Sequence, residues 1–244
     1  MDVLTAVAAS GLRSRMESLE MLANNTANAS TGGYKSDHEF YSLYVGTDAA
    51  DTNDPSTMPV IERPWTDFSQ GILTPTGNPL DLALSGNGFF SVDTPSGPLF
   101  TRNGNFHLAP NGQIVTAEGY AVRGTGGAKL TLTGTSPVEI TKDGALWQGG
   151  AVIGQLEIAD FTSTAGLVKQ GRSYFRAVDP SITPSAAKDA AVEQGRLEAS
   201  NAGTAEAAVR LISIMRQFEM LQKAASLGAE MNQHAIQDVA KVGS

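Results

Sequence analysis

The chain has 244 residues, a formal net charge of −8, 26 glycines, 11 prolines and no cysteine. Its length suffices for one large domain or for two smaller ones, each with a real core. Seventeen lysines and arginines are spread among 25 acidic residues, which leaves no concentrated basic face and argues against nucleic-acid binding. The absence of cysteine excludes disulfides, thiol nucleophiles and thiolate metal sites.

The first predicted element is a helix over residues 3–29. Its apolar residues recur at steps of three and four and form one narrow stripe: Val7, Ala8, Leu12, Met16, Leu19, Leu22 and Ala23. A stripe of this width is typical of a helix that pairs with another helix rather than one buried in a globular core. Gly32 and Gly33 predict the end of the helix, because glycine adopts the left-handed cap conformation without penalty.

The N-terminal sequence differs from a cleaved secretory signal. Asp2 stands where a basic region is expected, and Arg13 and Arg15 follow the apolar residues instead of preceding them. No stretch approaches the roughly 20 apolar residues that a transmembrane helix requires. We therefore expect no direct membrane insertion, and export, if it occurs, by a route without a cleaved signal peptide.

The hydrophobic pattern changes to a period of two in the middle of the chain, over residues 37–185. The segments 80–85 (LDLALS), 129–133 (KLTLT) and 138–140 (VEI) alternate apolar and polar residues, as half-buried strands do. The turn residues Pro110-Asn111-Gly112 lie between FHL and QIV and predict a hairpin. Gly86-Asn87-Gly88 predicts a tight turn or bulge between two strands. This part of the chain is predicted to be an antiparallel β domain.

A second, longer helix is predicted over residues 201–240. Leu211, Met215, Phe218, Leu221 and later apolar residues recur at helical spacing. Ser200 and Asn201 are candidate N-cap residues. About 40 helical residues would span roughly 60 Å, far more than an average helix.

No catalytic, cofactor or metal site is predicted. The three histidines, His38, His107 and His234, are scattered and none has a second ligand at metal spacing. The segment 124–131 (GTGGAKLT) contains glycines but lacks the Gly-Lys-Ser/Thr core of a phosphate-binding loop. We therefore expect that the protein is not an enzyme.

Three stretches resemble the axial proteins of the bacterial flagellum, the family of rod, hook and hook-associated proteins. They are 22–37 (LANNTANASTGGYKSD), 80–124, which begins LDLALSGNGFFSVDTPSGPLFTRNG, and 192–224 (VEQGRLEASNAGTAEAAVRLISIMRQFEMLQKA). The length is similar to that of a rod protein and most like the proximal rod subunit that carries a β domain. A distal rod or hook-type subunit is the nearest alternative. Thr26 and Ser30-Thr31-Gly32-Gly33 depart from the usual pattern and leave the subtype open.

The resemblance implies an α+β fold in which the terminal helices pair as a coiled coil and an antiparallel β domain is inserted between them. The expected segments are an assembly helix at 1–36, a connector at 37–79, the β domain at 80–190 and a second assembly helix at 191–244. The implied function is self-assembly, with other flagellar rod, hook and basal-body proteins, into the hollow driveshaft that crosses the periplasm. The implied export route is the flagellar type III apparatus. A β-domain binding module on a helical stalk and an unrecognised enzyme are the rival interpretations.

The predicted assembly residues lie in both terminal regions. They are Leu12, Met16, Leu19, Asn24, Asn25, Asn28, Tyr34, Ser200, Asn201, Leu211, Met215 and Phe218. The three asparagines are expected to face neighbouring subunits or the channel, because an uncharged amide can form hydrogen bonds there without the desolvation penalty of a charge. For Asn28 in particular, helix termination is the alternative, since asparagine favours caps and turns.

Overall fold

The computed structural model describes residues 3–39, 41–45, 57–61, 64–134, 136–179 and 182–242. The chain forms two compact units. Unit 1 contains residues 1–27, 37–67 and 203–244, and unit 2 contains residues 28–36 and 68–202. Residues 28–36, which include the buried Tyr34 and Lys35, belong to unit 2. The fold is α+β, with mostly antiparallel sheets and two long helices.

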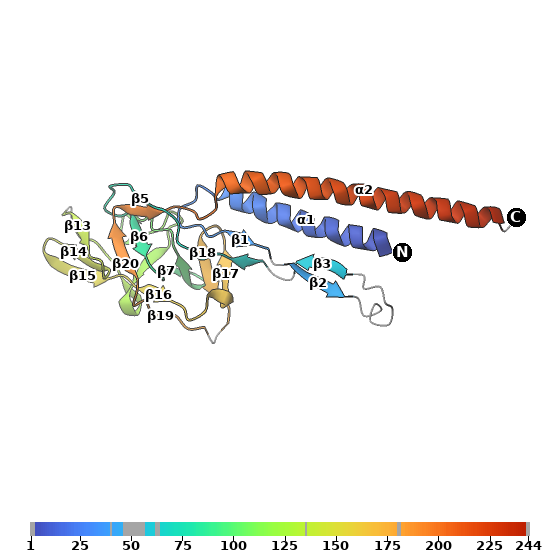
Figure 1. Ribbon diagram of the computed structural model, residues 1–244. Coiled ribbons are helices and arrows are strands. Elements are labelled where there is room, and N and C mark those ends of the chain that lie inside the picture. Colours follow the sequence, from blue (N-terminus) through green and yellow to red (C-terminus); the bar gives the residue numbers. More distant parts are fainter. Residues whose placement is uncertain are drawn as a thin grey trace. The chain divides into compact units, whose positions relative to one another are not determined.

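Unit 1 is built on two helices that contact each other, α1 (Val3–Ala27) and α2 (Thr204–Val242). They run antiparallel, and α2 continues past the N-terminal end of α1 (Figure 1). Two short antiparallel pairs complete this unit: β1 (Asp37–His38) with β4 (Trp65–Thr66), and β2 (Tyr41–Val45) with β3 (Thr57–Ile61). Strand β3 also contacts α1.

The helix boundaries differ from the predicted ones at three ends. The first helix ends at Ala27, so Gly32 and Gly33 do not terminate it. A turn follows the helix, in which the Thr31 N–H donates to the Asn28 carbonyl. The second helix starts at Thr204, so Ser200 and Asn201 are not its caps. It continues to Val242 and has 39 residues, which correspond to about 58 Å.

Unit 2 is dominated by an antiparallel sheet with the order β17-β18-β8-β7-β11-β10-β9, to which β12, β16 and β19 are attached. The bounds are β7 (Phe89–Thr94), β8 (Gly97–Thr101), β9 (His107–Leu108), β10 (Ile114–Val115), β11 (Ala121–Gly124), β12 (Ala128–Lys129), β16 (Ile158–Asp160), β17 (Leu167–Gln170), β18 (Tyr174–Ala177) and β19 (Ser185–Ala186).

Smaller sheets extend unit 2. One has three strands, and the other two are single antiparallel pairs. Their strands are β13 (Val138–Ile140), β14 (Ala145–Gln148) and β15 (Ala151–Gln155), then β6 (Leu82–Ser85) with β20 (Ala191–Gln194), and β5 (Leu73–Pro75) with β21 (Arg196–Glu198). Short 3-10 helices occupy Thr125–Gly127 and Thr164–Gly166.

The β prediction is confirmed in its main features. Strands β9 and β10 form the hairpin around Gly112, whose φ of 82° suits glycine. Gly86 and Gly88 both have positive φ in the turn between β6 and β7. Strand β6 departs from the predicted alternation, because Leu82, Ala83 and Leu84 are all buried. Two apolar clusters form the core of unit 2, one around Phe90, Phe106 and Leu146 and the other around Phe89, Phe100 and Phe175.

Candidate functional site

The seam between α1 and α2 is lined by small residues of α1. The most buried positions of this helix that face the seam recur at steps of three and four: Ala8, Gly11, Ser14, Ser18 and Leu22. A Cβ atom placed on Gly11 would lie 3.1 Å from a methyl group of Leu221 in α2. The absence of a side chain at Gly11 therefore lets the two helices approach closely at this position.

The predicted stripe on α1 lies beside this seam rather than at its centre. Leu12 and Leu19 are half-buried, and Met16 is 54% exposed. Met16 is therefore not at the centre of the helix pair, and its role as an assembly contact stays a prediction. The sequence pattern ranks positions by hydrophobicity, whereas close helix contact selects side chains by size.

The face of α2 that meets α1 also differs from the predicted one. Its less exposed residues recur at steps of three and four, and they include Ala207, Ile214, Leu221 and Gly228, which lie seven positions apart. Leu211 and Met215 are 42% and 52% exposed, so neither lies at the centre of the seam. Phe218 is half-buried beside Leu221. The apolar stripe read from the sequence thus combines one buried face with a neighbouring exposed one.

The three asparagines near the end of α1 have different environments. Asn24 is exposed, whereas Asn25 and Asn28 are buried. The Asn25 side-chain amide donates to the Asp37 carbonyl at 2.7 Å, and its oxygen accepts from the Asp37 N–H at 3.0 Å. The Thr31 hydroxyl donates to the Asn28 side-chain oxygen at 3.3 Å. Asn25 therefore acts within one chain, as the link between α1 and β1, a role that the sequence analysis did not include.

Replacing Asn25 with alanine is expected to destabilise unit 1. The Asp37 main chain would lose both partners in a half-buried position, at a cost of about 1–3 kcal/mol in the free energy of unfolding. Urea unfolding followed by the helical circular-dichroism signal measures this loss. Glu20→Gln, at an exposed position of the same helix, is the matched control, with an expected change within about 0.5 kcal/mol. Equal losses in the two variants would contradict the assignment.

The remaining predicted assembly residues belong to unit 2 and bind within it. Tyr34 is 2% exposed, and the ammonium group of Lys169 lies 4.3 Å from the centre of its ring. The Ser200 hydroxyl accepts from the Ala202 N–H at 3.1 Å, and the Asn201 side-chain oxygen accepts from the Ser36 N–H at 2.7 Å. Tyr34 is therefore buried in this chain, and its role in assembly stays a prediction.

The described residues also contain a groove of about 420 Å³ in unit 2, between Asp143, Glu157 and Ser185. The Glu157 carboxylate in it is paired with Arg123 at 3.4 Å. Among the described residues, no group of three or more His, Cys, Asp or Glu side chains could hold a metal ion. None of the helices in the described part of the chain has the length and apolarity needed to cross a membrane.

Comparison with known protein families matches two segments of the chain. The model of the flagellar hook protein FlgE/F/G D1 domain matches residues 83–148, which lie in unit 2. The model of the flagellar basal body rod FlgEFG protein C-terminal region matches residues 193–238, which include most of α2. The matched segments thus cover part of the β unit and the longer helix.

Individual proteins align over most of the chain. The flagellar basal-body rod protein FlgF of Caulobacter vibrioides is 32% identical over 92% of this chain and 92% of its own length. FlgF of Rhizobium meliloti is 34% identical over 82% of this chain and 83% of its own length. FlgG of Agrobacterium fabrum is 31% identical over 93% of this chain and 95% of its own length. The chain therefore belongs to the family of flagellar basal-body rod proteins and is a structural subunit of the rod.

Proposed function

We propose that this rod subunit joins copies of itself and other axial proteins through the exposed apolar sides of α2, with α1 and α2 paired as a coiled coil. The hollow rod so formed would cross the periplasm, and the subunit would reach it through the flagellar type III export apparatus without cleavage of a signal peptide. The observation that carries this proposal is the distribution of apolar side chains around α2. The proximal subtype stays a prediction, because relatives named FlgF and FlgG align over similar shares of the chain.

The coiled-coil part of the proposal rests on the spacing of the seam residues. Ala207, Ile214, Leu221 and Gly228 lie seven residues apart on α2. Gly11 and Ser18 are likewise seven apart on α1. A sustained seven-residue repeat keeps a seam facing its partner when two helices supercoil.

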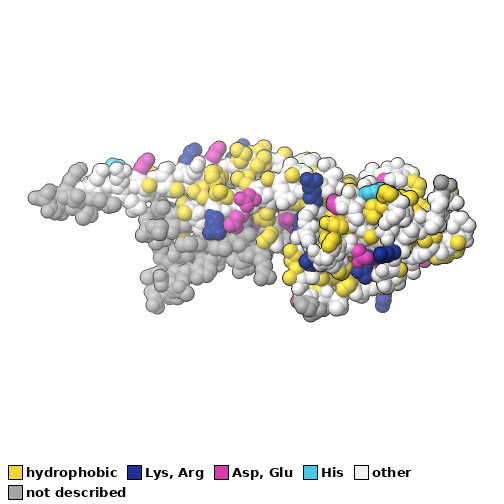
Figure 2. All heavy atoms as spheres, turned by 180° about the vertical axis from the view of Figure 1, so that it is seen from behind, with side chains coloured by type: hydrophobic (Ala, Val, Ile, Leu, Met, Phe, Trp, Pro, Cys, Tyr) yellow, Lys and Arg dark blue, Asp and Glu magenta, His cyan; other side chains and the backbone are white. Residues whose placement is uncertain are grey.

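Two further sides of α2 carry large apolar residues that α1 does not cover. With each residue turned about 100° from the previous one, the first flank lies about 40–100° from Ile214 and the second about 100–140° from it in the other direction. The first flank consists of Leu211, Met215 and Phe218, and the second consists of Val209, Met220, Leu227 and Met231. All but the half-buried Phe218 are exposed. Figure 2 shows apolar side chains gathered along the helices.

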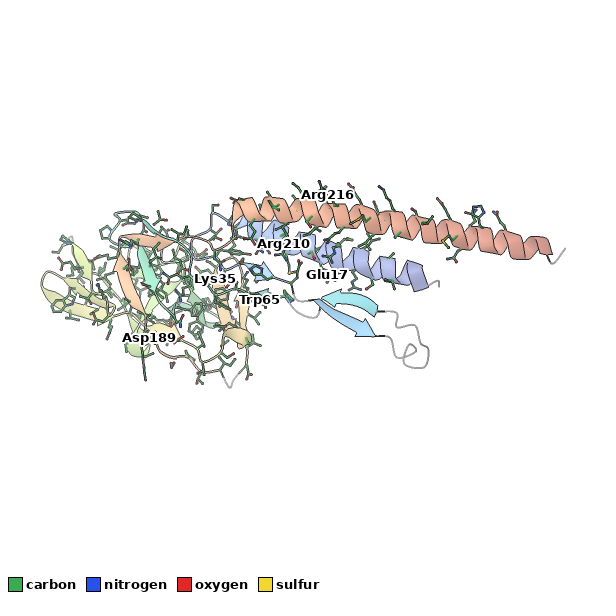
Figure 3. All side chains as sticks on the ribbon, viewed as in Figure 1. Glu17, Lys35, Trp65, Asp189, Arg210 and Arg216 are labelled. Carbon is green, nitrogen blue, oxygen red and sulfur yellow. The ribbon has the colours of Figure 1, made fainter. Side chains whose placement is uncertain are left out.

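A mainly charged ridge lies between the two flanks, and the exposed Ile212 is its apolar member. Arg216, Glu219 and Lys223 lie on the side of α2 opposite the seam, and Arg216 points away from α1 in Figure 3. Extended apolar surface bordered by polar residues marks interaction sites, because monomeric proteins rarely leave it in water. The arrangement gives α2 one partner within the chain and two open contact surfaces.

The two flanks are different surfaces, and this difference favours an open polymer over a closed dimer. A contact that joins one surface to a different surface of the next copy repeats head to tail, and it builds a ring or an open helix. A closed dimer would instead use the same surface on both copies. Two unlike flanks on one helix therefore favour helical growth, which suits a tubular rod.

The proposal predicts that a charge on either flank blocks assembly. The variants are Leu211→Glu with Met215→Glu on the first flank, and Met220→Glu with Leu227→Glu on the second. A carboxylate buried without a partner at an interface costs several kcal/mol, and the loss recurs at each junction of the polymer. Each variant is tested in a strain that lacks this gene, by swimming-halo diameter and by electron microscopy of basal bodies.

Arg216→Glu on the charged ridge is the matched control, with normal rods and swimming expected. Circular dichroism of the purified variants checks that the helices and the β unit are retained. Normal rods from both flank variants would refute the proposed contact surfaces. Loss of rods in the ridge control as well would show that any added negative charge on α2 is harmful.

A further inference from the structure

Unit 2 contains a cluster of three buried charges that the assembly function does not use. The Glu198 carboxylate accepts from the Lys35 ammonium group at 2.6 Å and from the Arg102 guanidinium group at 3.3 Å. The side chains of Lys35 and Glu198 are fully buried, and that of Arg102 is 5% exposed. Lys35 comes from the segment after α1, Glu198 from the end of β21 and Arg102 from the segment after β8. The cluster thus joins three distant parts of the sequence.

The same charged groups also bind the main chain around them. The Gly71 N–H donates to the Glu198 carboxylate at 2.9 Å, and the Lys35 ammonium donates to the Ser69 carbonyl at 2.5 Å. The Gly33 N–H donates to the Glu198 carbonyl at 2.8 Å. Figure 3 shows Lys35 among the side chains of the β unit rather than along the helices.

Asn201 completes the connection between the segments. Its side-chain oxygen accepts from the Ser36 N–H at 2.7 Å, and its amide donates to the Ser69 carbonyl at 3.3 Å and the Ser69 hydroxyl at 3.2 Å. The chain passes between the two units at four places, and three of them are after residue 36, before residue 68 and after residue 202. Each of these three passages therefore begins within a few residues of the charged cluster.

We propose that Glu198 is the positioning residue of a clamp that holds these three passages of the chain together as one cooperative element. Lys35, Arg102, Glu198 and Asn201 form the clamp. Removing a buried carboxylate leaves its partner cations unpaired, which costs far more than the paired arrangement contributes. The segments around residues 33–36, 69–71 and 198–201 consequently become ordered together or not at all. The Gly71 amide depends directly on the carboxylate, because it donates to it, whereas the Gly33 amide donates to the main-chain carbonyl of Glu198, which Glu198→Gln leaves in place.

Hydrogen exchange of the full-length chain in dilute solution tests the clamp without requiring assembly. In Glu198→Gln we expect at least tenfold faster exchange in peptides that cover residues 28–36, 68–72 and 198–203. Peptides from the core strands β7 and β8 should keep their protection. Glu157→Gln is the matched control, because Glu157 also pairs with an arginine but its side chain is 25% exposed. It should leave all three segments unchanged.

A second variant keeps the test decisive if Glu198→Gln fails to fold. Lys35→Met alone should accelerate exchange in the same three segments to a smaller extent, because Glu198 retains Arg102 and the Gly71 N–H. Lys35→Met added to Glu198→Gln should slow exchange relative to Glu198→Gln alone, because one unpaired buried cation is removed. Additive effects of the two substitutions would overturn the proposal. Acceleration confined to residues 198–203, or spread equally over the core strands, would also overturn it.

Discussion

Ile214→Asp is expected to separate α1 from α2 while leaving the β unit folded. Ile214 is 3% exposed. Gly11 lies opposite Leu221, and the two helices run antiparallel. Seven residues further along α1 and seven back along α2, Ser18 therefore lies opposite Ile214, and Ser18 is 1% exposed. Replacing a buried isoleucine with a smaller side chain costs about 2–5 kcal/mol, and an unpaired carboxylate in the same place adds to this loss. No other substitution on α2 should weaken the helix pair as much.

The absence of native cysteines allows a direct measurement of this pairing. A Gly11→Cys and Leu221→Cys chain should form an intramolecular disulfide under mild oxidation, because the Cβ position of Gly11 lies 3.7 Å from the Leu221 Cγ. Adding Ile214→Asp should slow disulfide formation at least tenfold. Adding Ile212→Asp, at a position that is 55% exposed, should not change the rate. A cross-link that forms equally fast in both variants would refute the assigned seam.

Gly33→Ala is expected to destabilise unit 2 strongly. Gly33 has a φ of 65°, and a Cβ atom there would lie 2.2 Å from the Asn103 nitrogen and 2.3 Å from the Arg102 carbonyl carbon. The backbone strain alone costs about 1–3 kcal/mol. The overlap with main-chain atoms adds to this cost, because a backbone cannot turn aside as a flexible side chain can.

Gly32→Ala is the control next to it in the sequence. A Cβ atom on Gly32 would first meet the Asn103 side-chain oxygen at 3.1 Å, which can move by a small rotation. We expect this variant to remain within about 1 kcal/mol of the parent chain in urea unfolding. With Trp65 of unit 1 replaced by phenylalanine in both variants, tryptophan fluorescence reports on Trp147, which lies in β14 of unit 2. Comparable unfolding midpoints for the two variants would contradict the close contact seen at Gly33.

The sequence by itself determined the order and the type of the main elements. The hydrophobic period changes from helical to alternating and back, because a helix and a strand present side chains to one side at different intervals. The hairpin at Pro110-Asn111-Gly112 followed from the requirement for positive φ at Gly112. These features depend on local backbone geometry, so a short segment of sequence is enough to predict them.

The tertiary structure decided which side of each helix meets the other. Hydrophobicity favoured Met16, Leu211 and Met215 for the seam, whereas the structure places Gly11, Ser18 and Ile214 there. Apolar side chains that contact another subunit produce the same sequence pattern as those that contact the other helix of the same chain. The distance between the two helix axes, which selects small residues, is a property of the pair and is absent from either segment alone.

The polar residues of two of the three resembling stretches, 22–37 and 192–224, depended on tertiary structure even more strongly. Asn25 binds the Asp37 main chain, and Lys35 binds Glu198, 163 residues further along the chain. Nothing in the local sequence distinguishes a lysine that faces water from one whose charge is buried beside a distant carboxylate. Folding brings Lys35 and Glu198 together. Burying either charge without the other would raise the free energy of the folded state, so the two charges are buried as a pair.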